Sequence, residues 1–324
     1  YVRWCGRTGG SIPPPTRFQI VRVNDRFEML YWDQPAEGNA GALRSTSTDG
    51  MDWTLPGSRA VFTEYNDAFT LLPVDGEYYL YQTMLEDWPD KPYPDNLPGK
   101  RRVIALRKSG DLETWTGQQV LLQPDAQDPP ETEFYLFKAV PFQGRFLGLL
   151  MKYFGDAENP NRHSVRIAVE MLTSNDAVVW ERPFRTTDLK FWTYADPFED
   201  NGKLHFPAGE RGGMVLRVFD ADRLFGVSPI DTEKEGVFTT RAFGMPARDL
   251  AVNVNARGGW ADVELLDGAG APLGGIGPCR IADIDSRSFR LTWEGLASSA
   301  FQLQQSRLRF RLYKSRVFAV IEAQ

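Results

Sequence analysis

Three acidic residues stand near the starts of predicted β-strands, each beside aromatic residues: Asp67, Glu133 and Asp196. Carboxyl groups that converge on one place raise each other's proton affinity, so one can stay protonated while another is ionised. Hydrolysis of a glycosidic bond needs such a pair: an acid for the leaving oxygen, and a base or nucleophile at the anomeric carbon. The simpler alternative for each acid is that it only caps a loop. We interpret the three together as a candidate catalytic set.

Other side chains near these acids are candidates for binding a sugar. Neighbouring aromatic rings can stack on sugar faces. His163 lies in a long loop and is a candidate substrate contact, whereas His205 lies inside a predicted strand and is expected to be packed. Arg211 could hold a hydroxyl or a carboxylate, although an exposed, solvated arginine is the simpler interpretation. The candidate substrate-binding residues are Tyr65, Tyr135, His163, Trp192, Glu210 and Arg211.

The elements that must position these residues are marked by a repeated motif, S-x-D-x-x-x-W. It occurs at 47–53, 109–115 and 174–180, so successive copies are 62 and 65 residues apart. A period of this length indicates a repeat architecture. The Ser and Asp side chains can hold a tight turn by accepting hydrogen bonds from nearby backbone N–H groups. With the Trp packed under the turn, the motif predicts a structural staple and not a catalytic group.

A predicted β-hairpin precedes each copy. Its tight turns are Asn24-Asp25, Asp75-Gly76 and Gln143-Gly144, and a fourth at Asn201-Gly202 precedes a degenerate copy without a Trp. No segment shows a sustained helical period. Four antiparallel strands per repeat predict the blades of a β-propeller over residues 1–235, with four repeats visible. The tight turns and staples then share one face, and the long loops share the other with the strand starts and their acids. Trp88 in one long loop is either a lid residue or an anchor for that loop.

After residue 235 the apolar pattern changes to short segments of period two separated by Gly-containing turns. This predicts a small antiparallel β-sandwich over residues 236–324. The chain is therefore predicted to be all-β, with a propeller followed by a sandwich.

Composition narrows the classes of partner. The 324 residues carry a net charge of −6, with no Lys/Arg cluster, so a nucleic-acid partner is not expected. No apolar run approaches the roughly 20 residues that span a membrane. No metal or nucleotide motif is present, so no cofactor is predicted.

Cys5 and Cys279 could pair, but two free thiols are at least as compatible with the sequence. The chain starts at Tyr1, so a secreted or periplasmic location after removal of a signal and a cytoplasmic location both stay open.

The staples, with acids near successive strand starts, resemble those of the five-bladed β-propeller glycoside hydrolases. These include the arabinanase/β-xylosidase and invertase/fructosidase families. The segments 261–267 and 291–295 resemble the C-terminal module of invertase-like bacterial proteins. The resemblance implies five blades and three acids acting together, with Glu133 matching the general acid by position. Asp67 and Asp196 are left for the other two roles.

The sequence also departs from these families. It has no W-x-N-D-P-N-G near its start, no R-D-P and no E-C pair, which argues against a true invertase. The first strand start, 12–17, carries no acid.

From these observations we predict a glycoside hydrolase acting on a small oligosaccharide or a chain end, with a furanoside such as an arabinofuranoside or fructofuranoside favoured. Replacing Glu133 with Gln is expected to abolish activity and leave folding intact. One alternative is a phosphorylase, which needs a cationic phosphate site for which Lys138 and Arg211 are candidates. Another is a propeller that binds carbohydrate without cleaving it. Carboxyl groups much farther apart than the ~5–10 Å found in glycosidases would favour that reading.

Overall fold

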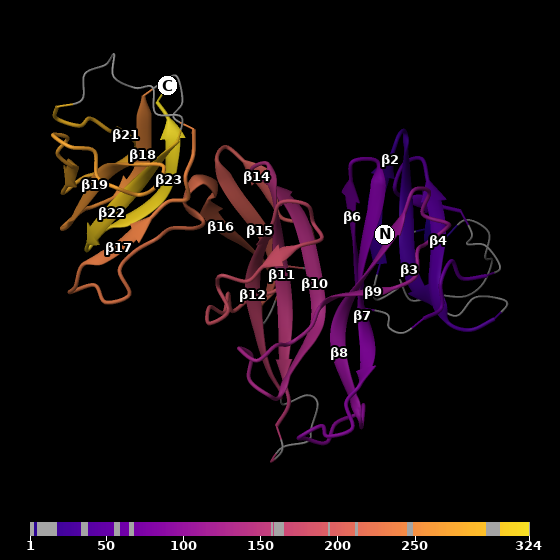
Figure 1. Ribbon diagram of the computed structural model, residues 1–324. Helices are drawn as coiled ribbons and strands as arrows, with labels where there is room; N and C mark the ends of the chain where they lie inside the picture. The colour runs from indigo at the N-terminus through magenta and orange to yellow at the C-terminus, as the bar shows by residue number, and fades with distance from the viewer. Residues whose placement is uncertain are drawn as a thin grey trace. The chain divides into compact units, whose positions relative to one another are not determined.

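The computed structural model describes residues 3–4, 18–33, 38–54, 59–64, 68–156, 158, 165–193, 195–210, 213–244, 249–295 and 305–323 (Figure 1). Within these residues every regular element is a β-strand except one 3-10 helix, η1 (Ala221–Arg223). Contacts divide the chain into two units, Tyr1–Asp196 with Ala208–Met214, and Pro197–Pro207 with Val215–Gln324. The predicted boundary at residue 235 lies inside the second unit and stays a prediction.

The first unit contains three consecutive antiparallel sheets. Their strand orders are β2-β3-β4, β6-β7-β8-β9 and β10-β11-β12-β13, so each sheet is a meander in chain order. A short parallel pair joins β1 (Arg3–Trp4) to β5 (Asp52–Trp53). The other strands are β2 (Phe18–Val23), β3 (Arg26–Asp33), β4 (Gly41–Ser47), β6 (Phe69–Val74), β7 (Glu77–Asp87), β8 (Lys100–Ser109), β9 (Gln119–Leu122), β10 (Thr132–Phe142), β11 (Arg145–Phe154), β12 (Arg166–Ser174) and β13 (Trp180–Glu181).

The S-x-D-x-x-x-W motif forms the same staple in all three copies. In the second copy, Ser109 Oγ accepts from the Leu112 N–H at 2.8 Å. The Asp111 carboxylate accepts from the N–H groups of Glu113 and Thr114 at 2.8 and 2.7 Å. The Trp115 indole then donates to the Leu112 carbonyl at 3.3 Å. Leu112 itself has φ +64°, the left-handed conformation that closes the turn. The predicted structural role of the motif is confirmed.

Tight turns set the register of the hairpins. Asp75 and Gly76 have φ of +47° and +86°, and Gln143 and Gly144 have +48° and +74°. Positive φ at both central residues matches the right-handed twist of the flanking strands. The pairs next to these turns, Val74 with Glu77 and Phe142 with Arg145, follow directly. Positions on the first strand of each hairpin can therefore be compared by counting back from its turn.

Successive sheets of the first unit pack against each other through two apolar clusters. One contains Leu30 from the first sheet with Phe69 and Leu80 from the second. The other contains Tyr81 from the second sheet with Phe137 from the third. The Tyr81 and Phe137 rings meet edge to face at 5.0 Å. Such packing of consecutive antiparallel meanders against each other is how propeller blades associate.

The second unit begins with most of a three-stranded sheet, in the order β14-β15-β16. Its strands are β14 (Phe198–Asp200), β15 (Lys203–Glu210) and β16 (Gly213–Asp220). Asn201 and Gly202 again have positive φ, which confirms the fourth hairpin. Where the first three repeats have a staple and an outer strand, this one continues into η1. The described residues thus contain four sheets of the repeat, and a fifth is not among them.

The rest of the second unit is a two-sheet sandwich, as predicted. Its sheets have the orders β17-β22-β19-β20 and β21-β18-β23. Val252, Val263 and Phe310 lie in the core between them and are fully buried. Cys279 is a buried free thiol, and burial raises its pKa, whereas Cys5 lies outside the described residues. The strands are β17 (Gly236–Thr239), β18 (Leu250–Asn255), β19 (Trp260–Asp267), β20 (Cys279–Ala282), β21 (Asp285–Arg290), β22 (Ser306–Tyr313) and β23 (Arg316–Glu322).

Candidate active site

A cavity of about 470 Å³ opens in the first unit at the starts of β2 and β6, beside the middle of β10. Residues of β11 and of the segment before Asp196 complete its wall. Four aromatic residues line it: Phe18, Phe69, Tyr135 and Trp192. Two of them, Tyr135 and Trp192, were predicted to bind substrate. The other lining residues are Gln19, Ala68, Thr70, Leu136, Lys138, Met151 and Thr193.

The polar part of this wall comes from equivalent positions in successive repeats. The residue five places before the first residue of the tight turn is polar in all four hairpins. Those residues are Gln19, Thr70, Lys138 and Asp196. The first three line the cavity, and Asp196 binds the third.

Lys138 and Asp196 form an ion pair beside the cavity. The Lys138 ammonium donates to Asp196 Oδ1 at 2.7 Å. The lysine side chain is 5% exposed and the aspartate side chain 68% exposed. The buried cation therefore holds a carboxylate that solvent and a substrate can still reach. Asp196 is one of the three predicted acids, and its catalytic role stays a prediction.

Glu133 is not in this cavity. Its side chain is fully buried, and its carboxylate accepts hydrogen bonds from Lys91 Nζ at 2.9 Å and Arg102 Nη1 at 2.9 Å. It also accepts from the Arg102 backbone N–H at 2.8 Å and from the Tyr93 hydroxyl. Asp95 accepts from both Lys91 and Arg102 and extends the network. With two cations and two further donors, Glu133 has no surface to offer a substrate.

The separation of Glu133 from Asp196 follows from strand length. Asp67, Glu133 and Asp196 lie eight, ten and five residues before their turns, so the three acids do not occupy equivalent positions in their hairpins. β10 has 11 residues and β6 has six, and β10 carries a bulge between Phe134 and Leu136. Glu133 therefore lies beyond the cavity, beside the end of β7 and the start of β8, which extend past the cavity.

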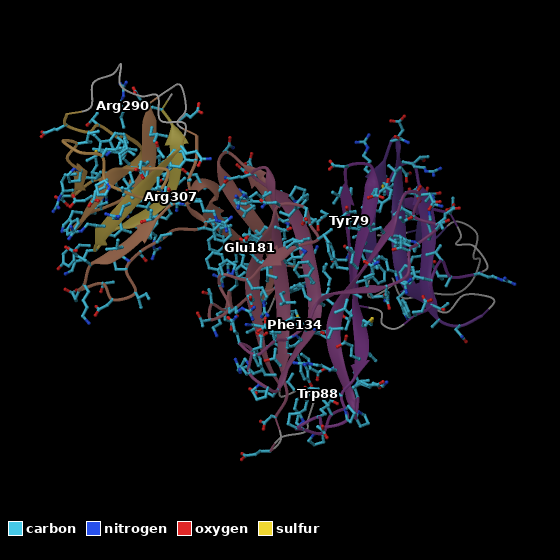
Figure 2. All side chains as sticks on the ribbon, viewed as in Figure 1. Tyr79, Trp88, Phe134, Glu181, Arg290 and Arg307 are labelled. Carbon is cyan, nitrogen blue, oxygen red and sulfur yellow. The ribbon has the colours of Figure 1, made fainter. Side chains whose placement is uncertain are left out.

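The loop that covers Glu133 is anchored by Trp88, which Figure 2 labels near the end of the β7–β8 hairpin. Its ring meets Tyr93 edge to face at 6.0 Å, and the Arg101 guanidinium lies 4.8 Å from its centre. Of the two roles open to Trp88, these contacts support the anchor.

Several predicted residues lie outside the described part of the chain. Asp67 and Tyr65 belong to a segment that ends directly before the lining residue Ala68. His163 and Arg211 are likewise outside it, and nothing is described of the side chain of Glu210. His205 is packed as expected, with its ring stacked on Phe198 at 4.9 Å.

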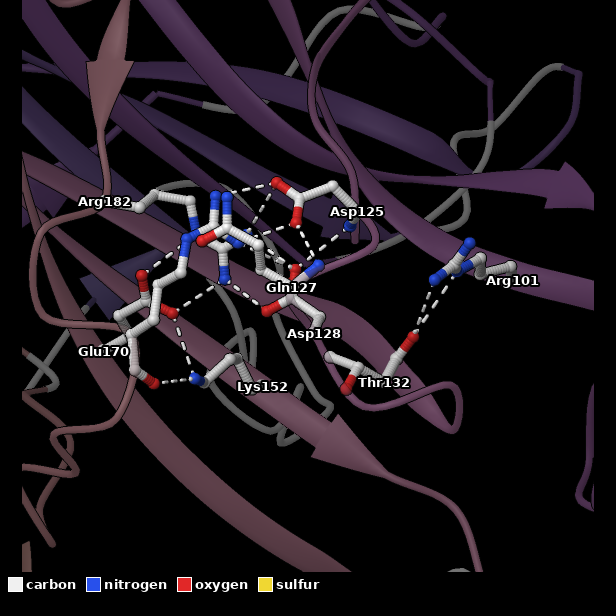
Figure 3. Close-up of polar contacts among 9 residues, drawn as sticks. Arg101, Asp125, Gln127, Asp128, Thr132, Lys152, Glu170 and Arg182 are labelled. Atoms are coloured by element: carbon white, nitrogen blue, oxygen red, sulfur yellow. Dashed lines mark hydrogen bonds and ion pairs between the residues drawn. The ribbon is translucent and has the colours of Figure 1, made fainter.

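A second buried ionic cluster lies in the third sheet and the loop before it (Figure 3). Arg182 bonds both oxygens of Asp128 at 2.7 Å and also Glu170 at 2.8 Å. Lys152 pairs with Glu170 at 3.0 Å. Burial, the largest single effect, would raise the pKa of Asp128. The hydrogen bonds from Arg182 and from the Asp125 N–H, with the charges of Arg182 and Arg185, together outweigh burial and lower that pKa. Each acid already has a cation, so we interpret the cluster as a fastening of the loop to the sheet.

Sequence reasoning missed most of the cavity wall. Phe18, Gln19, Phe69 and Met151 were not singled out, and Lys138 was considered only as a phosphate contact. The available signal was the polar residue five places before each tight turn.

Among the described residues, no group of three or more His, Cys, Asp or Glu is placed to hold a metal ion. None of the helices described there is long and apolar enough to cross a membrane.

No protein-family model matches the sequence, and comparison with curated proteins gave no match. Solved structures do match. A family 32 β-fructofuranosidase of Bombyx mori is 12% identical with a TM-score of 0.43, over 94% of this chain and 78% of that one. A family 117 glycoside hydrolase of Zobellia galactanivorans is 12% identical with a TM-score of 0.44, over 62% and 65% of the two chains. A β-1,2-mannobiose phosphorylase of Listeria innocua is 14% identical with a TM-score of 0.41, over 63% and 57%.

Proposed function

We propose that this chain is a glycoside hydrolase whose active site is the cavity beside Lys138 and Asp196. The observation that carries the proposal is the accessible Asp196 carboxylate, fixed by a buried ammonium at 2.7 Å next to an aromatic-walled cavity of about 470 Å³. Glycosidic cleavage needs a carboxylate at a defined position, and an aromatic-walled cavity beside that carboxylate can receive a ring of the substrate.

Asp67 is the natural second carboxyl group. In the sequence it directly precedes Ala68, which lines the cavity. In this proposal Asp67 and Asp196 share the acid and base or nucleophile roles. Glu133, which the family resemblance assigned as the general acid, instead holds the β7–β8 loop and β8 through its hydrogen bonds to Lys91, Tyr93 and Arg102. The substrate proposed is a small oligosaccharide or a chain end, with furanosides first, because of the sequence resemblance.

Binding without cleavage is the second candidate, and one specific observation favours it. Glu133, which the family resemblance assigned as the general acid, is buried outside the cavity, and its carboxylate accepts four hydrogen bonds from the protein. Phosphorolysis rests on Lys138, a cation in the cavity wall, although its ammonium is already paired with Asp196. Turnover that depends on added phosphate would select phosphorolysis over hydrolysis.

The test is Asp196→Asn, assayed against a panel of aryl furanosides and pyranosides. We expect turnover to fall by about 10²- to 10⁴-fold, the range for loss of a general acid or base. The variant should still fold, because Asn keeps a side-chain oxygen and the Asp196 position is 68% exposed. Some stability is lost because the buried Lys138 ammonium no longer faces a charge, and urea unfolding measures that loss. Asp200→Asn, an exposed acid in β14, is the matched control and should keep wild-type rates. Wild-type turnover by Asp196→Asn would refute the proposal, and sugar binding by a wild-type chain that cleaves nothing would select the binding candidate.

A further inference from the structure

Several polar side chains in the cavity wall make hydrogen bonds within the protein. Thr70 Oγ1 donates to the Phe137 carbonyl at 2.5 Å, and Thr193 Oγ1 donates to the Ala195 carbonyl at 2.6 Å. The Lys138 ammonium donates to Asp196.

Gln19 is engaged at both ends of its amide. Its Nε2 donates to the Phe18 carbonyl at 2.8 Å, and its Oε1 accepts from the Leu71 N–H at 3.4 Å. These polar groups are few, and the greater part of the wall offers no hydrogen-bonding group at all. A sugar hydroxyl placed against that apolar part would lose water without gaining a partner, which is costly.

The rest of the wall is apolar and rich in rings. Phe18, Phe69, Tyr135 and Trp192 supply four aromatic faces or edges, and Leu136 and Met151 fill between them. Aromatic rings favour edge-to-face and offset contacts with one another, and a thioether makes favourable contacts with ring edges. A volume of about 470 Å³ lies within the range of small-molecule sites and exceeds what a single ring needs.

We propose that this cavity binds an aromatic group joined to the sugar, so that the substrate is an aryl glycoside or an aromatically substituted one. The aromatic group occupies the apolar wall, and the glycosidic bond lies toward Asp196, the accessible charged group beside the cavity. The inference rests on the proposed function for the placement of the sugar. The binding of the aromatic group itself depends only on the cavity.

The experiment is calorimetric titration of the full chain with 4-nitrophenol, and with the 4-nitrophenyl and methyl glycosides of the same sugars. Binding is measured rather than rate, because 4-nitrophenolate is a good leaving group and would speed cleavage without any contact. We expect 4-nitrophenol to bind with one-to-one stoichiometry, and any 4-nitrophenyl glycoside to bind more tightly than its methyl counterpart.

Two variants link the binding to this wall. Phe18→Ala removes a ring that is 42% exposed and lies on the cavity, and Phe198→Ala removes one that is 48% exposed and is not among the lining residues. We expect Phe18→Ala to weaken 4-nitrophenol binding about tenfold, the upper range for loss of one ring pair. Phe198→Ala should leave it unchanged. No binding at millimolar 4-nitrophenol, or equal losses in both variants, would overturn the inference.

The outcomes separate this inference from the proposed function. If 4-nitrophenol binds and Phe18→Ala weakens it, but no glycoside is cleaved, the aromatic site stands and the hydrolase proposal fails. If methyl glycosides are cleaved and 4-nitrophenol does not bind, the hydrolase stands and the aromatic site fails.

Discussion

Replacing Glu133 with Gln is predicted to destabilise the fold, which is opposite to the expectation from sequence. The carboxylate is fully buried and faces Lys91 and Arg102, whose side chains are only 3% and 6% exposed. A neutral amide keeps the shape but leaves these two cations with Asp95 as their remaining buried acid. One of its two terminal atoms also becomes a donor that faces other donors.

The expected size follows from the burial. Removing one partner of a buried ion pair typically costs about 3–5 kcal/mol, because an uncompensated charge stays behind. We expect a loss of that order in the free energy of unfolding, measured by urea unfolding followed by circular dichroism. Tyr93 is not expected to supply a replacement anion, because burial, which the variant retains, raises the pKa of its phenol.

Two further variants test the reasoning. Asp87→Asn breaks the Lys100–Asp87 pair, whose side chains are 45% and 83% exposed, and should cost only about 0–1 kcal/mol. Adding Lys91→Met to Glu133→Gln removes one of the two buried cations that have lost the Glu133 carboxylate. The double variant should recover part of the lost unfolding free energy. If Glu133→Gln unfolds within about 1 kcal/mol of wild type while activity disappears, the network argument is refuted and the catalytic role of Glu133 is restored.

Other predictions concern the site and the scaffold. Asp196→Asn should lose turnover and keep its fold, and Phe18→Ala should lose affinity for 4-nitrophenol while Phe198→Ala does not. The backbone N–H groups of Thr114 and then Glu113 lower the pKa of Asp111 to about 2 from its ordinary 3.8. Its stabilising contribution is therefore present above pH ~4 and is lost as the pH falls through 2. The Tm difference between wild type and Asp111→Asn should shrink from pH 5 to pH 2, and a constant difference would contradict this. Gly148→Ala should cost about 1–3 kcal/mol in unfolding free energy, since a Cβ there would lie 2.7 Å from both the Phe137 and Trp180 rings. Gly144→Ala does not test this crowding, because a Cβ at Gly144 would meet nothing but would sit at φ +74°. An unchanged Tm for Gly148→Ala would mean that the two rings move aside at little cost.

The staples and the tight turns could be predicted from the sequence alone. Each staple closes within seven residues, so Ser109, Asp111 and Trp115 carry all the partners that their turn requires. The tight turns are equally local, since Asp75-Gly76 and Gln143-Gly144 accept positive φ without help from distant residues. The repeat, the all-β class and the sandwich therefore followed from sequence.

The tertiary structure decided which side chains meet, because that depends on strand lengths and on the neighbouring sheet. In the sequence Glu133 and Asp196 have similar surroundings, because each is an acid near aromatic residues. The long strand β10 carries Glu133 to Lys91 in the β7–β8 loop and to Arg102 in β8, whereas Asp196 meets Lys138 beside the cavity. Hydrogen bonds within a turn are set by a few adjacent residues. The surroundings of a charge are set by whatever the fold packs around it, and at Glu133 that was four donors in place of solvent.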